Sequence, residues 1–196
     1  MIYDCKLFYI IGFFNYNILN IVLNKFQKRK LAMNSTSMIH ACSTSLISLM
    51  GNSRLLRMNT GGYFLFDILY LIRNRKINLM NGLYLYHHMA GLYYISLDPH
   101  IYNWVQNTGW GEFSNIANYI LYYYLKIGDT VNINFWKKIQ LVWFGFMRTI
   151  IFTYLGYKEF KDVKKRKKIY PVLPLYFLGL IWTGFMVKQN ISYLNM

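Results

Sequence analysis

Two adjacent histidines, His87 and His88, lie in the middle of an apolar segment that reads Tyr-Leu-Tyr-His-His-Met-Ala-Gly. A neutral imidazole can act as a general base near neutral pH, so a histidine at membrane depth could deprotonate an amine or a hydroxyl. Neighbouring side chains on a helix point about 100° apart, so the pair can line one cavity or contact two different groups. A structural role, in which both rings hydrogen-bond neighbouring helices, explains the pair equally well.

Further ionisable side chains lie inside apolar segments: His40, Asp67 and Arg148, with Glu112 near the start of another such segment. A charge at the centre of a bilayer costs about 2.5–3.5 kcal/mol on insertion scales, so we expect these groups to face a cavity or a partner. Asp67 has two interpretations. It either orients a histidine in a polar cavity or forms a buried ion pair with Arg148, for which Asp67 and Glu112 are the acidic candidates.

The histidines do not favour a metal centre. The chain has four, at His40, His87, His88 and His100. Membrane di-iron enzymes such as desaturases use more histidines, arranged in several boxes, and an elongase-like His-x-x-His-His is absent because position 84 is Tyr84. We predict no metal ligands, with a mononuclear site built from one histidine and Asp67 as the weaker alternative.

Composition places these residues in a membrane protein. Apolar residues make up 55% of the 196 residues and charged residues only 15%, whereas a soluble domain carries about 25% charged residues. The aromatic content of 19% excludes a disordered chain. Two cysteines, Cys5 and Cys42, exclude a disulfide scaffold. The net charge of +15 comes from short basic clusters between long apolar stretches, which is typical of membrane-protein loops and argues against nucleic-acid binding.

Seven apolar stretches have roughly the length that spans a bilayer, about 20 residues. No stretch alternates with a period of two, so helices are favoured over a β-barrel. The N-terminal stretch lacks a small-x-small cleavage site and is expected to be a first transmembrane helix rather than a signal peptide. The predicted spans are Leu7–Leu23, Leu31–Met50, Gly61–Ile72, Gly82–Leu97, Trp110–Ile127, Ile139–Tyr157 and Ile169–Val187.

The basic residues do not fix the orientation of these spans. With seven spans, the side that carries the C-terminus holds eleven Lys and Arg residues, and the other side holds ten. Seven of those ten lie in the cluster Lys158–Lys168. Without that cluster the positive-inside rule would place the C-terminus in the cytoplasm.

The order of short motifs resembles the TLC domain, which is shared by ceramide synthases, translocon-associated membrane proteins and small TLC-domain proteins of lipid homeostasis. The resemblance covers about residues 30–187 and is closest to the small proteins. It rests on Ser37-x-x-His40, Gly62-Tyr63-Phe64-x-x-Asp67, His87-His88, Glu112-x-Ser114 with Asn118, and Arg148. The chain departs from the small proteins at Asn115-Ile116, where they carry Thr-Pro, and it lacks the further aspartate of ceramide synthases.

The resemblance implies an all-α, multi-pass bundle in which six helices form a barrel-like domain with a central cavity. We divide the chain into residues 1–30, an N-terminal transmembrane helix and basic loop; residues 31–187, the TLC-like domain; and residues 188–196, a short tail. The expected catalytic residues are His87, His88 and Asp67. Polar residues that line a lipid cavity or support the bundle are expected at His40, Glu112, Ser114, Asn118 and Arg148.

Three functions follow from these expectations. The first is lipid binding or lipid homeostasis, with a membrane lipid or acyl chain as the partner. The second is ceramide-synthase-like acyl transfer with acyl-CoA as co-substrate, in which Arg73, Arg75 and Lys76 either attract the CoA phosphates or only set the topology. The third is a translocon-associated or structural role. By resemblance, we expect an integral protein of the endoplasmic reticulum or another internal membrane, and no oligomeric state is indicated.

Overall fold

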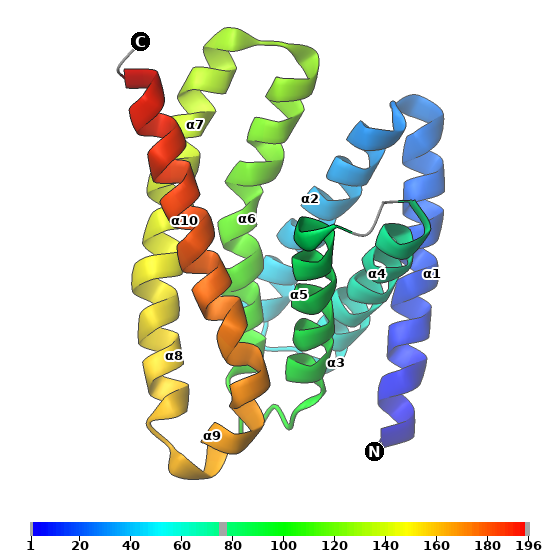
Figure 1. The fold of residues 1–196 in the computed structure, drawn as a ribbon. Helices are drawn as coiled ribbons and strands as arrows, with labels where there is room; N and C mark the ends of the chain where they lie inside the picture. Colours follow the sequence, from blue (N-terminus) through cyan, green and yellow to red (C-terminus); the bar gives the residue numbers. More distant parts are fainter. Residues whose placement is uncertain (1, 75–77, 195–196) are drawn as a thin grey trace.

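The computed structural model describes residues 2–74 and 78–194, and these residues fold into helices without a strand. The chain runs up and down between the two ends of the molecule (Figure 1). The helices are α1 (Ile2–Phe26), α2 (Arg29–Leu49), α3 (Ser53–Leu56), α4 (Gly62–Asn74), α5 (Leu79–Ser96), α6 (Trp104–Ile127), α7 (Thr130–Phe146), α8 (Phe152–Phe160), α9 (Val163–Ile169) and α10 (Leu173–Leu194).

Short π-helical turns join some of these helices into longer ones. The turn η1 (Arg57–Gly61) connects α3 to α4, and η2 (Met147–Ile151) connects α7 to α8. A 3-10 turn, η3 (Tyr170–Val172), leads from α9 into α10. The described chain therefore has seven long helical stretches in the predicted order, and the third extends well before Gly61 to Ser53.

Polar side chains and glycines set the helix ends. The side chains of Asn52, Asn78 and Asp129 each accept a hydrogen bond from the backbone N–H three residues later, which satisfies a free donor at the start of a helix. Gly128 ends α6 in the left-handed conformation, with φ of 77°, and Gly51 adopts a φ of 67° in the turn after α2. Glycine meets no Cβ clash in this conformation.

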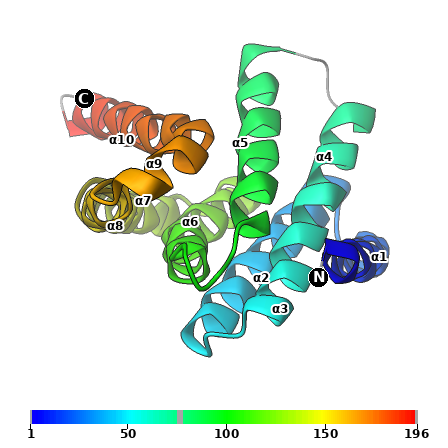
Figure 2. The ribbon, with the colours of Figure 1, turned by 90° about the horizontal axis from the view of Figure 1, so that it is seen from below.

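Three helical segments are long and apolar enough to cross a membrane: Leu7–Phe26, Thr130–Phe160 and Lys165–Lys188. They correspond to α1, to α7 with α8, and to the stretch that ends in α10. These helices lie at the two sides of the molecule when it is viewed along its length (Figure 2). The other four long stretches are more polar, because they carry the Ser, Thr, Asn, His and acidic residues of the interior.

The side chains are arranged inside out relative to a water-soluble protein. Large apolar side chains such as Leu7, Ile18 and Val142 are more than half exposed on the outer helices. Polar side chains such as Thr36 and His40 are fully buried. Contiguous exposed apolar surface on this scale is expected where lipid covers the protein.

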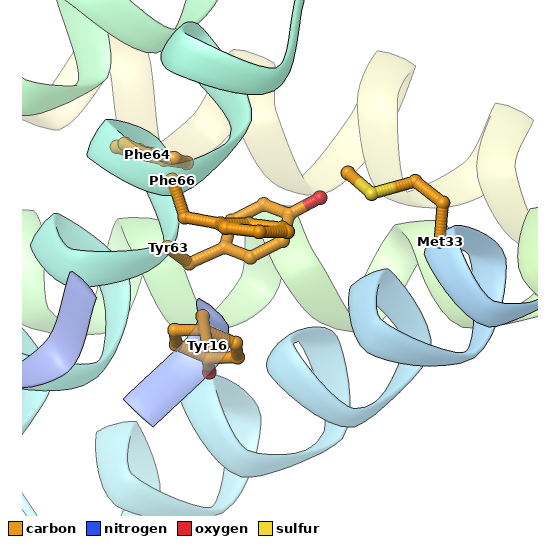
Figure 3. Close-up of a cluster of buried hydrophobic side chains, with 5 residues drawn as sticks. All are labelled: Tyr16, Met33, Tyr63, Phe64 and Phe66. Carbon is orange, nitrogen blue, oxygen red and sulfur yellow. The ribbon is translucent and has the colours of Figure 1, made fainter. Parts of the chain in front are cut away.

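The inner helices pack against one another, and buried apolar side chains of the described residues gather in two clusters. The most extensive helix pair is α2 with α6, and α1 packs against α4 and η1. An aromatic cluster fills the space between α1, α2 and α4. Figure 3 shows four of its rings together with Met33, and the Tyr63 hydroxyl points toward α2. The cluster consists of Tyr16, Met33, Tyr63, Phe64 and Phe66.

Candidate functional site

The shortest ionic contact in the interior joins two predicted site residues. His88 Nε2 lies 2.6 Å from Asp67 Oδ2, and both side chains are buried. Asp67 is presented by α4 and His88 by α5, two helices that follow each other in the chain and pack together. The carboxylate therefore fixes the orientation of the His88 imidazole and its tautomer at Nε2. Asp67 therefore contacts a histidine and not Arg148, but neither Asp67 nor His88 belongs to the cavity lining that contains His87.

The predicted ion pair between Asp67 and Arg148 does not form. Arg148 is buried, and within the described part of the chain no carboxylate lies at ion-pair distance from it. Its Nη2 donates to the carbonyl oxygen of Gly111 at 3.2 Å and to Asn115 Oδ1 at 3.3 Å. The reason is topological, because η2 carries Arg148 on the side of the molecule opposite α4, with α5 and α6 between them (Figure 2).

The Arg148 side chain is held in place by aromatic rings and a glycine. Its guanidinium carbon lies 5.1 Å from the centre of the Phe144 ring and 4.7 Å from that of Phe152, so two cation–π contacts offset part of the desolvation of the charge. A Cβ at Gly179 of α10 would come within 3.3 Å of Arg148 Cδ. The glycine therefore makes room for the stem of the arginine.

His40 lies in a second polar group around Tyr63. The two rings stack with their centres 3.9 Å apart and their planes 11° apart. The Tyr63 hydroxyl forms a hydrogen bond of 2.7 Å with Ser37 Oγ. His40 Nδ1 lies 3.7 Å from Glu112 Oε2, beyond hydrogen-bond distance, and neither His40 nitrogen has a hydrogen-bond partner. His40 is thus a packed interior ring beside an acidic side chain.

A cavity of about 360 Å³ opens between α5, α6, α8 and α10. Its size is within the range of small-ligand pockets, about 300–1,000 Å³. Most of its wall is apolar, with Phe152, Leu155 and Leu175 among the lining side chains. The polar and ionisable side chains of the wall are the ones that can orient a ligand. They are His87, Tyr94, Asn107, Thr108, Glu112, Arg148, Thr153, Tyr157, Glu159 and Tyr176.

The two adjacent histidines have different environments. His87 lines the cavity, and its Nδ1 is buried without a hydrogen-bond partner. His88 and Asp67 lie outside the lining. The Phe64 ring contacts both histidines, at 6.4 Å from His87 and 5.0 Å from His88 between ring centres. Of the three residues predicted to be catalytic, His87 alone faces the space in which a ligand would lie.

The remaining predicted site residues have structural contacts. Ser114 is fully buried and donates to the carbonyl oxygen of Gly111 at 2.6 Å. Asn118 Oδ1 accepts a hydrogen bond of 2.9 Å from Gln140 Nε2, which joins α6 to α7. Of the basic residues considered for CoA binding, Arg73 lies in the last turn of α4, while Arg75 and Lys76 lie outside the described residues.

Sequence reasoning missed two buried residues at the far end of the cavity, Asn107 and Glu159. Glu159 is 2% exposed, and its Oε1 accepts a hydrogen bond of 2.6 Å from the backbone N–H of Asn103. Asn107 Nδ2 donates to the Tyr94 hydroxyl at 2.6 Å. Glu159 lies in the basic stretch that begins at Lys158, so its sequence context indicated an exposed loop. The sequence signal that could have identified Glu159 is an acidic residue at the end of an apolar helix.

The described residues contain no group of three or more His, Cys, Asp or Glu side chains that could hold a metal ion. No protein-family model matches the chain, and no curated protein or solved structure is significantly similar to it. Function has therefore to be inferred from the residues and their geometry.

Proposed function

We propose that this chain is a multi-pass integral membrane protein that binds a membrane lipid or a fatty acyl chain in the cavity between α5, α6, α8 and α10. The observation that carries the proposal is a largely apolar cavity, about 360 Å³ in volume, with buried polar side chains at defined points of its wall. Apolar walls accommodate an aliphatic chain, and a few fixed polar groups orient its headgroup.

The proposal extends to the topology and the cellular role. All seven long helical stretches would span the membrane, and side chains such as Leu46, Leu69 and Met89 would bring α2, α4 and α5 into contact with lipid as well. The TLC-like motifs support a role in lipid homeostasis and a location in the endoplasmic reticulum or another internal membrane. The pairs Ser37–Tyr63 and Asp67–His88 hold several of these motifs together.

Lipid binding can be tested by filling the cavity. Gly156 lines the cavity, and a Cβ there would meet no atom within 4 Å, so Gly156→Phe would place a ring in the cavity. Gly184→Phe is the matched control, because Gly184 has equally open surroundings on α10 away from the lining. Both variants are purified in phospholipid nanodiscs, and the bound lipids are identified by mass spectrometry. We expect a lipid that is retained by the wild type and Gly184→Phe and lost from Gly156→Phe; equal retention by all three would contradict the proposal.

The unpartnered Nδ1 of His87 favours acyl transfer as the second candidate function. In that reaction His87 would accept a proton from a hydroxyl or amine held in the cavity. The freed nucleophile would attack the thioester carbonyl of a long-chain acyl-CoA, and the CoA thiolate would leave. The assay measures transfer of an acyl group from acyl-CoA to a sphingoid base. We expect His87→Ala to abolish any transfer and His100→Ala, at an exposed turn, to preserve it; absence of transfer by the wild type would exclude this function.

A further inference from the structure

The cavity has polar groups at two separate ends. Arg148 contacts Gly111 of α6, whereas Glu159 contacts Asn103 just before the start of that helix, and Asn107 lies between Asn103 and Gly111 on it. Arg148 and Glu159 belong to the same continuous helix of η2 and α8. A rise of about 1.5 Å per residue therefore separates them by about 16 Å along the cavity. A ligand that reaches both ends has to be elongated.

The Arg148 end offers hydrogen-bond donors and a positive charge, and Glu112, which is not at ion-pair distance from Arg148, also lines the cavity beside Gly111. The Nε of Arg148 is buried and has no hydrogen-bond partner, while Nη2 is used by Gly111 and Asn115. A guanidinium binds a carboxylate through its planar arrangement of donors, and the bond is strengthened by charge and by burial. His87 Nδ1 is also free at this end, and it can donate when it carries the proton. This end fits a carboxylate.

The Glu159 end has two buried acceptors without a partner, beside the Tyr94 hydroxyl, which accepts from Asn107. Glu159 Oε2 and Asn107 Oδ1 are buried without a hydrogen-bond partner. The other polar atoms of these two side chains are already engaged, Glu159 Oε1 with the Asn103 N–H and Asn107 Nδ2 with the Tyr94 hydroxyl. Buried acceptors that stay unpaired are costly, so this end is matched by a ligand group that donates a hydrogen bond.

We infer that the cavity selects an aliphatic chain that is polar at both ends, with a carboxylate at Arg148 and a hydroxyl at Glu159 and Asn107, as in an ω-hydroxy fatty acid. The inference rests on the proposed lipid-binding function and names the class of lipid. A chain of this kind pairs the polar atoms at both ends and leaves its methylene groups against Phe152 and Leu155 in the middle. A simple fatty acid would leave the two acceptors of Glu159 and Asn107 unpaired.

The test compares the affinities of laurate and ω-hydroxylaurate for the protein in phospholipid nanodiscs. We expect ω-hydroxylaurate to bind about tenfold more tightly, the effect of one buried hydrogen bond. Equal affinities would overturn the inference and leave the lipid-binding proposal standing. Binding of neither chain, together with unchanged bound lipid in Gly156→Phe, would overturn both.

A substitution at Glu159 tests whether the preference for ω-hydroxylaurate comes from the unpartnered acceptors at that end of the cavity. Glu159→Gln keeps the carbonyl oxygen that accepts from Asn103 and replaces Oε2 by an amide that donates. We expect the affinity ratio of the two chains to fall from about tenfold to about one, because the unpartnered acceptor Oε2 is replaced by a donor. Asp98→Asn, at an exposed turn, is the control in which the ratio stays at about ten. A ratio that persists in a Glu159→Gln protein with wild-type thermal stability would overturn the inference.

Discussion

At the scale of single residues, the ionisable side chains of the interior fall into separate groups. Asp67 and His88 form a close pair between α4 and α5. Arg148 instead contacts a backbone carbonyl oxygen and aromatic ring faces. The division matters for function, because the close pair lies outside the cavity lining, although His88 Nδ1 has no hydrogen-bond partner. Groups of the lining with unpartnered atoms, such as Arg148 and His87, are the ones available to a ligand.

The Asp67–His88 pair is expected to be a major contribution to stability. Asp67→Ala leaves His88 buried without its carboxylate, and breaking a buried pair in this way costs about 3–5 kcal/mol. In a double-mutant cycle with His88→Phe, the two losses should be non-additive by about 1–3 kcal/mol. Unfolding of each variant in mixed detergent micelles measures these free energies. Additive losses would show that the 2.6 Å contact contributes no coupling.

The sequence identified the ionisable residues but could assign only some of their partners. Asp67 and His88 lie on consecutive helices, and consecutive elements usually pack side by side, so this pairing could be predicted. The absence of an Asp67–Arg148 contact depends on the order of helices across the bundle, which residue spacing does not determine. The roles of Glu159 and Asn107 depend on the rotation of α8 and α6 about their axes, for which the sequence carries only a weak signal.

At the scale of helices, the crossing of α1 and α4 depends on two glycines. A Cβ at Gly12 would collide with the backbone carbonyl of Met58, and a Cβ at Gly62 would collide with the backbone of Gly12. Backbone atoms cannot move aside as a flexible side chain does. Small residues at such a crossing allow two helices to approach closely in a membrane.

Gly12→Ala should therefore weaken the bundle. We expect a loss of about 1–3 kcal/mol, the usual cost of overpacking a close contact. Gly184→Ala is the matched control, because a Cβ there meets no atom within 4 Å; it should leave stability unchanged or raise it by up to about 1 kcal/mol through helix propensity. Thermal unfolding of both variants in the same detergent makes the comparison, and equal melting temperatures would contradict the close crossing.

The start of α7 should respond to pH through Asp129. The side-chain amide and the backbone N–H of Asn132 both donate to this carboxylate, at 2.7 Å and 3.1 Å, and they hold the pKa of Asp129 below its usual range. A lowered pKa means that the cap stabilises the helix above the ordinary aspartate pKa and is lost as pH falls through the lowered one. An NMR titration should show the Asn132 amide shifting with a midpoint below that of an ordinary aspartate. Asp129→Asn is the control: it should abolish the titration and keep the cap, because an asparagine side chain also accepts from the Asn132 N–H. A wild-type midpoint at or above that of an ordinary aspartate would contradict the assignment.

The number and order of long helices could be predicted because apolar length is a local property of the chain. All seven predicted stretches lie on long helices in the expected order. Their ends were less accurate: the stretch predicted from Ile139 begins nine residues earlier at Thr130, after the Asp129 cap. The π-helical turns η1 and η2 were not predicted, because the apolar pattern locates helical stretches but does not distinguish a π-helical turn from an α-helical one.

At the scale of the whole molecule, the up-and-down path puts the basic residues at two opposite ends. The α1–α2 and α6–α7 turns and the C-terminus lie at one end, and α9 with the α5–α6 connection lies at the other (Figure 1). The counts of eleven and ten Lys and Arg residues at these ends are nearly balanced. The positive-inside rule therefore does not favour either orientation of this chain, because the cluster Lys158–Lys168 offsets the basic residues at the other end.

The arrangement still predicts that the two ends face opposite sides of a membrane. Single cysteines at Asp129 and at Asp162, in a chain with Cys5→Ser and Cys42→Ser, should react with a membrane-impermeant maleimide from different sides of sealed vesicles. In vesicles of uniform orientation, we expect one of the two to be labelled at once and the other only after permeabilisation. Labelling of both from the same side would require the long helix from Thr130 to Phe160 to lie along the membrane instead of crossing it. That outcome would also remove the lipid cavity from the bilayer interior, because α8 forms one of its walls.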